Sequence, residues 1–137
     1  LDIDDFKAVN DTHGHLAGDQ VIITLARLLK TRLRMSDIIG RYGGEEFVVL
    51  LKGVDDQRAG ELIDELRRDF EQVDFHAGGK RFRCTFSAGI SSFPEHPSTE
   101  SLRLSADQAL YRAKHQGRNQ VVISTEQDHD GFAPRGA

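Results

Sequence analysis

Apolar residues recur along the chain with two periods, and their alternation predicts the order of the structural elements. Over Leu1–Asp5 apolar and acidic residues alternate, which is typical of a short strand with its carboxylates on one face. Over Leu16–Arg34 the apolar positions step by three or four, which predicts an amphipathic helix. Phe6–His15 lies between them and contains Gly14, so we expect a helical turn that runs into a loop.

Two glycine pairs and two further amphipathic segments define the rest of the chain. Gly43-Gly44 and Gly78-Gly79 each separate segments of strand character, which is the usual position of a hairpin turn. The expected strands are Leu1–Asp5, Asp37–Tyr42, Glu45–Leu51, Val73–His76, Arg81–Phe93 and Gln120–Ser124. The expected helices are Leu16–Arg34, Asp55–Glu71 and Thr99–Gln116.

The order β-α-β-β-α-β-β-α-β predicts a single α/β (α+β) domain. We expect a central, mostly antiparallel sheet flanked by helices, similar to a ferredoxin-like palm with an added hairpin. The domain is expected over residues 1–124. Residues 125–137 are polar and contain Gly and Pro, so we expect them to form a disordered tail.

Composition and charge exclude several classes of protein. The chain has 137 residues, which fits one domain, and 38% of them are hydrophobic, which is enough for a core. Its net charge of −4 argues against binding a nucleic-acid polymer through bulk basic charge. The single Cys84 cannot form an internal disulfide, and we expect a cytoplasmic location for the domain.

The charges are unevenly distributed along the first third of the chain. Residues 1–25 contain five aspartates and one basic residue, Lys7, whereas residues 26–41 contain five basic residues and one acidic residue, Asp37. An acidic pocket beside a basic strip suits a ligand that combines a metal with phosphate.

Two acidic pairs are candidates for a metal site. Asp2 and Asp4 are two residues apart on the first expected strand, so both carboxylates project to the same side. Glu45 and Glu46 begin the strand after the Gly43-Gly44 turn, and one of them can join Asp2 at a hard divalent cation. Without further context, the same residues are also typical of an acidic strand face and an ordinary hairpin.

Three separated motifs give the sequence a resemblance to a known family. They are Asp2-Ile3-Asp4-x-Phe6-Lys7-x-x-Asn10-Asp11-x-x-Gly14-His15-x-x-Gly18-Asp19, then Arg41-Tyr42-Gly43-Gly44-Glu45-Glu46-Phe47, and finally Ala106-Asp107-x-Ala109-Leu110-Tyr111-x-Ala113-Lys114-x-x-Gly117-Arg118-Asn119. In this order they resemble the GGDEF family of diguanylate cyclases, in its GGEEF variant. Family members usually begin with a further turn and helix, so the resemblance implies a nucleotidyl-cyclase-like domain that is N-terminally incomplete.

The resemblance implies a reaction and a set of partners. Two GTP molecules condense to cyclic di-GMP and two pyrophosphates, and a homodimer is required because each domain holds one GTP. Mg²⁺ or Mn²⁺ is implied as the cofactor, with two ions per active site. A fused sensory or receiver domain is expected in the full-length protein, together with a possible membrane anchor outside this region.

The resemblance also assigns roles to individual residues. It implies that Glu45 accepts the proton of the attacking hydroxyl and that Lys7 stabilises charge in the transition state. The implied metal ligands are Asp2, the carbonyl of Ile3, Glu45 and Glu46. The implied substrate-binding residues are Phe6 and Lys7 near the phosphates, Asn10, His15 and Asp19 around guanine, Gly43 and Gly44 in the hairpin, and Lys114 and Arg118 at the terminal phosphates.

The segment Arg34-Met35-Ser36-Asp37 is an RxxD sequence just before the hairpin. Its offset from Gly43-Gly44 matches the family's inhibitory site, which implies feedback by cyclic di-GMP bound to Arg34 and Asp37. In isolation RxxD is also typical of a helix end and a turn.

One alternative function is a catalytically inactive GGDEF-like module that binds cyclic di-GMP or GTP as a signalling receptor. Asp2, Lys7 and Glu45 favour the enzyme, because a receptor needs no metal-binding carboxylates. A third alternative is another nucleotidyl cyclase or a palm-type polymerase. Asn10 and Asp19 favour guanine, and the short chain has no room for domains that grip a template.

Overall fold

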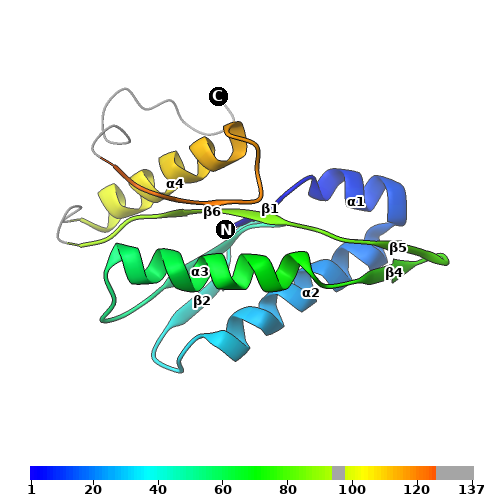
Figure 1. The fold of residues 1–137 in the computed structure, drawn as a ribbon, viewed down its shortest axis with the longest axis horizontal. Coiled ribbons are helices and arrows are strands. Elements are labelled where there is room, and N and C mark those ends of the chain that lie inside the picture. The colour runs from blue at the N-terminus through cyan, green and yellow to red at the C-terminus, as the bar shows by residue number, and fades with distance from the viewer. Residues whose placement is uncertain (94–97, 126–137) are drawn as a thin grey trace.

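Helices and strands alternate along the chain in the computed structural model, which describes residues 1–93 and 98–125 (Figure 1). The helices of this part are α1 (Phe6–His13), α2 (His15–Arg32), α3 (Asp56–Glu71) and α4 (Thr99–His115). The strands are β1 (Asp2–Ile3), β2 (Ile38–Arg41), β3 (Phe47–Leu50), β4 (Phe75–Ala77), β5 (Lys80–Phe82), β6 (Phe86–Ile90) and β7 (Val121–Ile123).

The strand β1 lies between the β2–β3 hairpin and the long strand β6. It pairs antiparallel with β6, and β6 pairs in parallel with β7. On its other side, an antiparallel bridge joins Asp2 to Glu46, and the N–H of Ile3 donates to the carbonyl of Glu45 at 3.1 Å. The β4–β5 hairpin forms a separate antiparallel ribbon. The short first strand is therefore the element that brings the hairpin next to β6.

Helices cover both faces of β6 (Figure 1). On one face, α2 and α3 pack apolar side chains against the sheet, and Leu25, Leu66, Phe70 and Phe86 are fully buried there. On the other face, α4 approaches β6 closely because its contact surface is made of small residues, Ala109 and Ala113. Burial of these apolar surfaces is the main stabilising contribution to the fold.

The predicted α/β class is confirmed, with four helices and small, mostly antiparallel sheets in the described residues. The Gly43-Gly44 hairpin, the Gly78-Gly79 turn and the three amphipathic helices are also confirmed, with ends that differ by a few residues. Cys84 is buried. Residues 126–137 of the expected tail lie outside the described residues. No helix in the described ranges is long and apolar enough to cross a membrane.

Two predictions about local structure are wrong. The expected turn at residues 6–15 is the regular helix α1, which stops only where Gly14 takes a φ of 92°. The expected single strand Arg81–Phe93 is broken between Phe82 and Phe86. Polar contacts explain this break, because Arg83 donates to Asp74 at 2.9 Å and the hydroxyl of Thr85 donates to Asp4 at 2.7 Å.

The contact between β6 and α4 predicts that Gly89 cannot be replaced. A Cβ at Gly89 would lie 2.1 Å from the carbonyl oxygen of Ala106 and 2.3 Å from the backbone nitrogen of Leu110. Because these are backbone atoms, α4 would have to move, and we expect Gly89→Ala to lower the free energy of unfolding by about 3 kcal/mol. Urea denaturation measures this. Gly40→Ala is the control, because a Cβ there meets nothing within 4 Å, and equal stability of the two variants would contradict the packing described.

Candidate active site

The carboxylate of Asp4 lies at the end of β1 and is 5% exposed. It accepts four hydrogen bonds, from Lys114 Nζ at 2.6 Å, Ser87 Oγ at 2.7 Å, Thr85 Oγ1 at 2.7 Å and the backbone N–H of Asn119 at 3.0 Å. Burial by itself would raise the pKa of Asp4, but the hydrogen bonds from Lys114, Thr85 and Ser87 outweigh it and hold the pKa below its usual value. Asp4 therefore remains ionised in the interior.

Asp2 shares the same lysine but has the opposite electrostatic balance. Lys114 Nζ lies 3.3 Å from Asp2 Oδ1, so both carboxylates face one ammonium group, as their spacing on a strand predicts. Burial raises the pKa of Asp2, and the nearby carboxylates of Glu46 and Glu45 raise it further, against the opposing effect of Lys114. Negative charge is therefore concentrated around Asp2.

The Gly43-Gly44 hairpin tip lies beside this charge. The guanidinium of Arg41 donates to the carbonyl of Gly44 from Nε at 3.1 Å and from Nη2 at 2.8 Å, which holds the loop in shape. Gly43 has a φ of 87°, and a Cβ on either glycine would meet nothing within 4 Å. The tip therefore leaves open space in which a ligand can approach the backbone.

The residues at this junction fit a divalent cation that arrives with its own phosphate ligands. Among residues 1–93 and 98–125, no three His, Cys, Asp or Glu side chains form a ready-made metal cluster. Asp2 does offer a buried carboxylate whose repulsion with Glu45 and Glu46 a cation would relieve. Mg²⁺ usually takes one or two protein carboxylates and completes its shell with substrate phosphates and water.

Three of the residues expected at the phosphates, Phe6, Lys7 and Arg118, lie around the start of α1. Phe6 and Lys7 occupy the first turn of this helix, where backbone N–H groups have no intrahelical acceptor and can bind an anion. The Lys7 side chain is 92% exposed and lies 3.8 Å from Asp11. Arg118 Nε lies 3.8 Å from Asp5 Oδ1, so its half-exposed side chain reaches the turn between β1 and α1.

The residues expected around guanine lie where α1 meets α2. Asn10 Oδ1 is buried and has no hydrogen-bond partner within the part of the chain that the structure describes. A Cβ on Gly18 would lie 2.0 Å from this oxygen, so only glycine allows Asn10 to occupy its position. His15 and Asp19 are exposed on α2. An unpaired buried acceptor is costly and calls for a donor from a ligand or water.

The structure joins Arg34 and Asp37 in one closed turn. The backbone N–H of Arg34 donates to Asp37 Oδ2 at 2.9 Å, and the guanidinium reaches both Asp37 and the carbonyl of Lys52. Burial acts to raise the pKa of Asp37, but hydrogen bonds from Arg34 and from the N–H of Lys52 lower it overall. A pocket of about 240 Å³ lies alongside, and two further arginines, Arg32 and Arg58, contribute to its lining.

Three residues at the site were given no role from the sequence. Thr85 and Ser87 hold Asp4, and the signal for them is a pair of hydroxyls two residues apart in the otherwise apolar segment 84–90. Asn119 belongs to the third motif, and its signal is an asparagine two residues after Gly117, where the helix has ended. Asn tolerates a left-handed backbone and can bond locally.

Comparison with known proteins agrees with this fold. The family described as diguanylate cyclase, GGDEF domain matches residues 1–120 of the chain. The nucleotidyl-cyclase-like α/β domain is thus the class that the match defines. The chain belongs to the GGDEF domain family.

The chain is similar to parts of longer curated proteins. It is 45% identical over 124 residues to diguanylate cyclase DgcP of Pseudomonas aeruginosa, covering 90% of this chain and 18% of DgcP. It is 40% identical over 125 residues to diguanylate cyclase A of Treponema denticola, covering 90% of this chain and 34% of that protein. The chain therefore spans less than half the length of these relatives.

Solved structures share the fold. The GGDEF domain of PA1120 (TpbB or YfiN) from P. aeruginosa has a TM-score of 0.86 and 34% identity, covering 93% of this chain and 76% of that chain. The active GGEEF domain of a diguanylate cyclase from Vibrio cholerae has a TM-score of 0.82 and 33% identity, with 91% and 80% covered. The GGDEF domain of DgcB from Caulobacter crescentus, in complex with c-di-GMP, has a TM-score of 0.84 and 32% identity, with 89% and 73% covered.

The ionisation of Asp4 predicts a pH-dependent contribution to stability. Because its folded pKa lies below the ordinary value of 3.8, the charged carboxylate stabilises the fold above pH 3.8 and loses this effect as the pH falls through the folded pKa. We expect Asp4→Asn to lower the free energy of unfolding by about 2 kcal/mol at neutral pH. Denaturation curves of both proteins, at pH 7 and below pH 3.8, measure the difference.

The control is Asp11→Asn, at an exposed aspartate, which should change the stability by less than about 0.5 kcal/mol. A gap between wild type and Asp4→Asn that stays constant or widens as the pH falls would contradict the assigned charge state.

Proposed function

We propose that this chain is the catalytic domain of a diguanylate cyclase, which condenses two GTP molecules to cyclic di-GMP and two pyrophosphates. The observation that carries the proposal is the junction at β1, where Asp2, the Glu45–Glu46 hairpin strand and Lys114 meet from three distant parts of the chain. Relatives about 40% identical to the chain are named diguanylate cyclases, which supports the same activity here.

Mg²⁺ or Mn²⁺, two ions per active site, is the cofactor that we assign to this junction. Asp2, the carbonyl of Ile3 and Glu45 are the proposed ligands, with Glu46 assisting. When bound, such ions polarise the phosphate oxygens and offset their charge. The single ammonium group of Lys114 is shared between the carboxylates of Asp2 and Asp4 in the described structure. A cation beside Asp2 would release part of this ammonium charge toward the terminal phosphates of GTP, where Arg118 also acts.

Glu45 is the proposed proton acceptor in the chemical step. The 3′-oxygen of one GTP forms a bond to the α-phosphorus of the other, and the bond from that phosphorus to pyrophosphate breaks. The proton of the 3′-hydroxyl passes to the carboxylate of Glu45. Lys7 stabilises charge that develops on the phosphate, and the first-turn N–H groups of Phe6 and Lys7 hold it. The step occurs twice, between two domains that each hold one GTP.

Asn10, Asp19 and His15 form the proposed guanine pocket. The unpaired buried Oδ1 of Asn10 supports this assignment, because guanine supplies N–H donors. The exposed carboxylate of Asp19 can accept from N1–H and the 2-amino group, and adenine has neither donor. We therefore expect GTP to be used in preference to ATP.

Arg34 and Asp37 form the proposed inhibitory site for the product. Asp37 is already saturated by its turn and its side chain is only 2% exposed, so the guanidinium of Arg34 is the main group available to a phosphate or guanine. Arg32 and Arg58 line the same pocket and add positive charge. This arrangement suits a dianionic ligand with two purine rings.

The whole protein is expected to act as a homodimer driven by a fused sensory or receiver domain. The chain spans only 18% of DgcP, which supports the presence of further domains in the full-length protein. We propose a ferredoxin-like palm as the architecture of this domain and the cytoplasm as its location. The alternative, an inactive GGDEF-like receptor, would bind GTP or cyclic di-GMP without turnover.

Glu45→Gln separates the enzyme from the receptor. The amide keeps the shape of the side chain but cannot accept the proton or hold the cation, so we expect turnover of GTP to fall at least about a hundredfold. Release of pyrophosphate and formation of cyclic di-GMP are the measurements. Glu61→Gln, an exposed glutamate on α3, is the control and should keep its activity. Near-normal turnover of GTP by Glu45→Gln would show that Glu45 neither accepts the proton nor holds the cation.

Arg34→Ala tests the product site. Loss of a charge-assisted contact should weaken the binding of cyclic di-GMP about ten- to a hundredfold. Calorimetric titration of the wild type and the variant with cyclic di-GMP measures this, with Arg27→Ala on α2 as the control. Equal affinities of all three proteins would mean that Arg34-Met35-Ser36-Asp37 is only a helix end and a turn.

A further inference from the structure

Strained backbone gathers in two loops that face each other at the site. Among the described residues other than glycine, positive φ angles occur at Asp5 (54°), Arg118 (62°) and Asn119 (47°). Asp5 lies between β1 and α1, and the other two lie between α4 and β7. The Arg118–Asp5 ion pair spans the gap between the loops. Left-handed backbone at such residues is unfavourable and persists only where surrounding contacts hold it.

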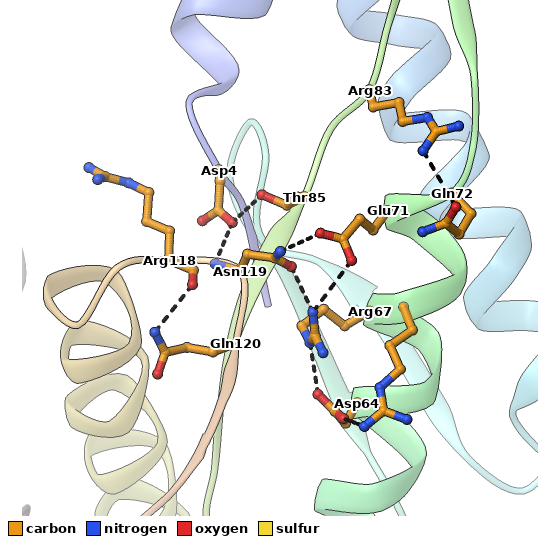
Figure 2. A network of polar contacts seen from close by, with 11 residues as sticks. Asp4, Asp64, Arg67, Glu71, Gln72, Arg83, Thr85, Arg118, Asn119 and Gln120 are labelled. Carbon is orange, nitrogen blue, oxygen red and sulfur yellow. Dashed lines mark hydrogen bonds and ion pairs between the residues drawn. The ribbon is translucent and has the colours of Figure 1, made fainter.

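Asn119 supplies the contacts that hold its loop (Figure 2). Its backbone N–H donates to Asp4 Oδ2 at 3.0 Å, which ties the loop to β1. Its side-chain amide bonds twice to α3: Nδ2 donates to Glu71 Oε2 at 2.6 Å, and Oδ1 accepts from Arg67 Nη1 at 2.9 Å. Arg67 is itself held by Asp64 at 2.7 Å. One residue therefore connects the loop to a strand and to a helix on the far side of the sheet from α4.

Arg118, the residue before Asn119 in the loop, is the cation expected to bind the terminal phosphates. The N–H of Arg118 donates to the carbonyl of Ala113 at 2.9 Å, so the backbone of Arg118 is fixed at both ends. Its side chain extends away from the loop (Figure 2), and its Nε lies 3.8 Å from Asp5 Oδ1. Because the backbone is fixed on both sides of Arg118, Asn119 helps to determine where the Arg118 side chain starts and in which direction it extends.

We propose that Asn119 is a positioning residue that acts through Arg118. It ties the left-handed turn between α4 and β7 to β1 and to α3. The Arg118 guanidinium therefore lies near the start of α1, where the terminal phosphates of GTP would bind. This inference rests on the proposed function, because it assumes that Arg118 contacts those phosphates.

The chemistry of the amide explains why asparagine occupies this position. The amide of Asn119 donates to the Glu71 carboxylate from Nδ2 and accepts from the Arg67 guanidinium at Oδ1, so one short side chain serves both partners through separate atoms. A carboxylate at position 119 would still accept from Arg67, but it would face Glu71 with like charge. Asparagine also tolerates the left-handed conformation better than most residues.

A donor–acceptor swap tests the anchor. We expect Asn119→Asp to weaken the binding of 3′-deoxy-GTP, which cannot be cyclised, about tenfold in the presence of Mg²⁺. In the double variant Asn119→Asp with Glu71→Gln, the Gln amide can donate to the new carboxylate, and the affinity should return to within about threefold of wild type. Asn119→Asp with Glu65→Gln has the same net charge without the new hydrogen bond, and it should remain weak.

A second cycle tests whether the effect passes through Arg118. Arg118→Ala should itself weaken the binding of 3′-deoxy-GTP, and adding Asn119→Asp to it should have no further effect. If Arg118→Ala binds as tightly as wild type, the proposed phosphate role fails, and the inference fails with it. If Arg118→Ala binds weakly but Asn119→Asp adds its full effect, the inference alone is wrong and the proposed function stands.

Thermal unfolding of every variant separates positioning from a merely structural role. Asn119→Asp with lower thermal stability and unchanged affinity would overturn the inference. Should Asn119→Asp fail to fold, Arg67→Met removes the same anchor from the side of α3, and it is expected to weaken binding in the same direction. Unchanged affinity in a folded Arg67→Met would also overturn it.

Discussion

The buried ion pair between Lys114 and Asp4 is the interaction on which the rest of the structure depends. It joins α4 to the end of the first strand, and the hydroxyls of Thr85, directly before β6, and Ser87, on β6, complete the environment of the carboxylate. A buried charge is tolerated only when it is paired and hydrogen-bonded, so these three parts of the chain have to fold together. The candidate active site is thus built on the same contacts that close the domain.

The two neighbouring aspartates, Asp2 and Asp4, have opposite pKa shifts and therefore different roles. Asp4 receives enough hydrogen bonds to remain ionised, and its role is to hold other groups in place. Burial and the charges of Glu46 and Glu45 raise the pKa of Asp2 against the effect of Lys114, so a further positive charge would stabilise its ionised form. A difference of one pleat along a strand therefore separates an anchor from a candidate metal ligand.

The sequence predicted those features that arise from local periodicity and turn chemistry. The helices α2, α3 and α4 follow from apolar residues at helical spacing, and the β2–β3 hairpin follows from Gly43-Gly44. The break before Phe86 and the role of Asn119 could not be read from local pattern. Both depend on polar contacts between residues far apart in the chain, such as Asn119 with Glu71 and Thr85 with Asp4. The convergence of Asp2 with Lys114 came from motif resemblance rather than from periodicity.

The central claim is that two copies of this domain, each with one GTP, carry out the condensation at the β1 junction. The most direct measurement is the initial rate and stoichiometry of the reaction with GTP and Mg²⁺ over a dilution series of the protein. The account predicts two pyrophosphates for each cyclic di-GMP and a rate per protein molecule that falls on dilution, because the reacting domains must meet. Binding of GTP without release of pyrophosphate at every protein concentration would contradict it.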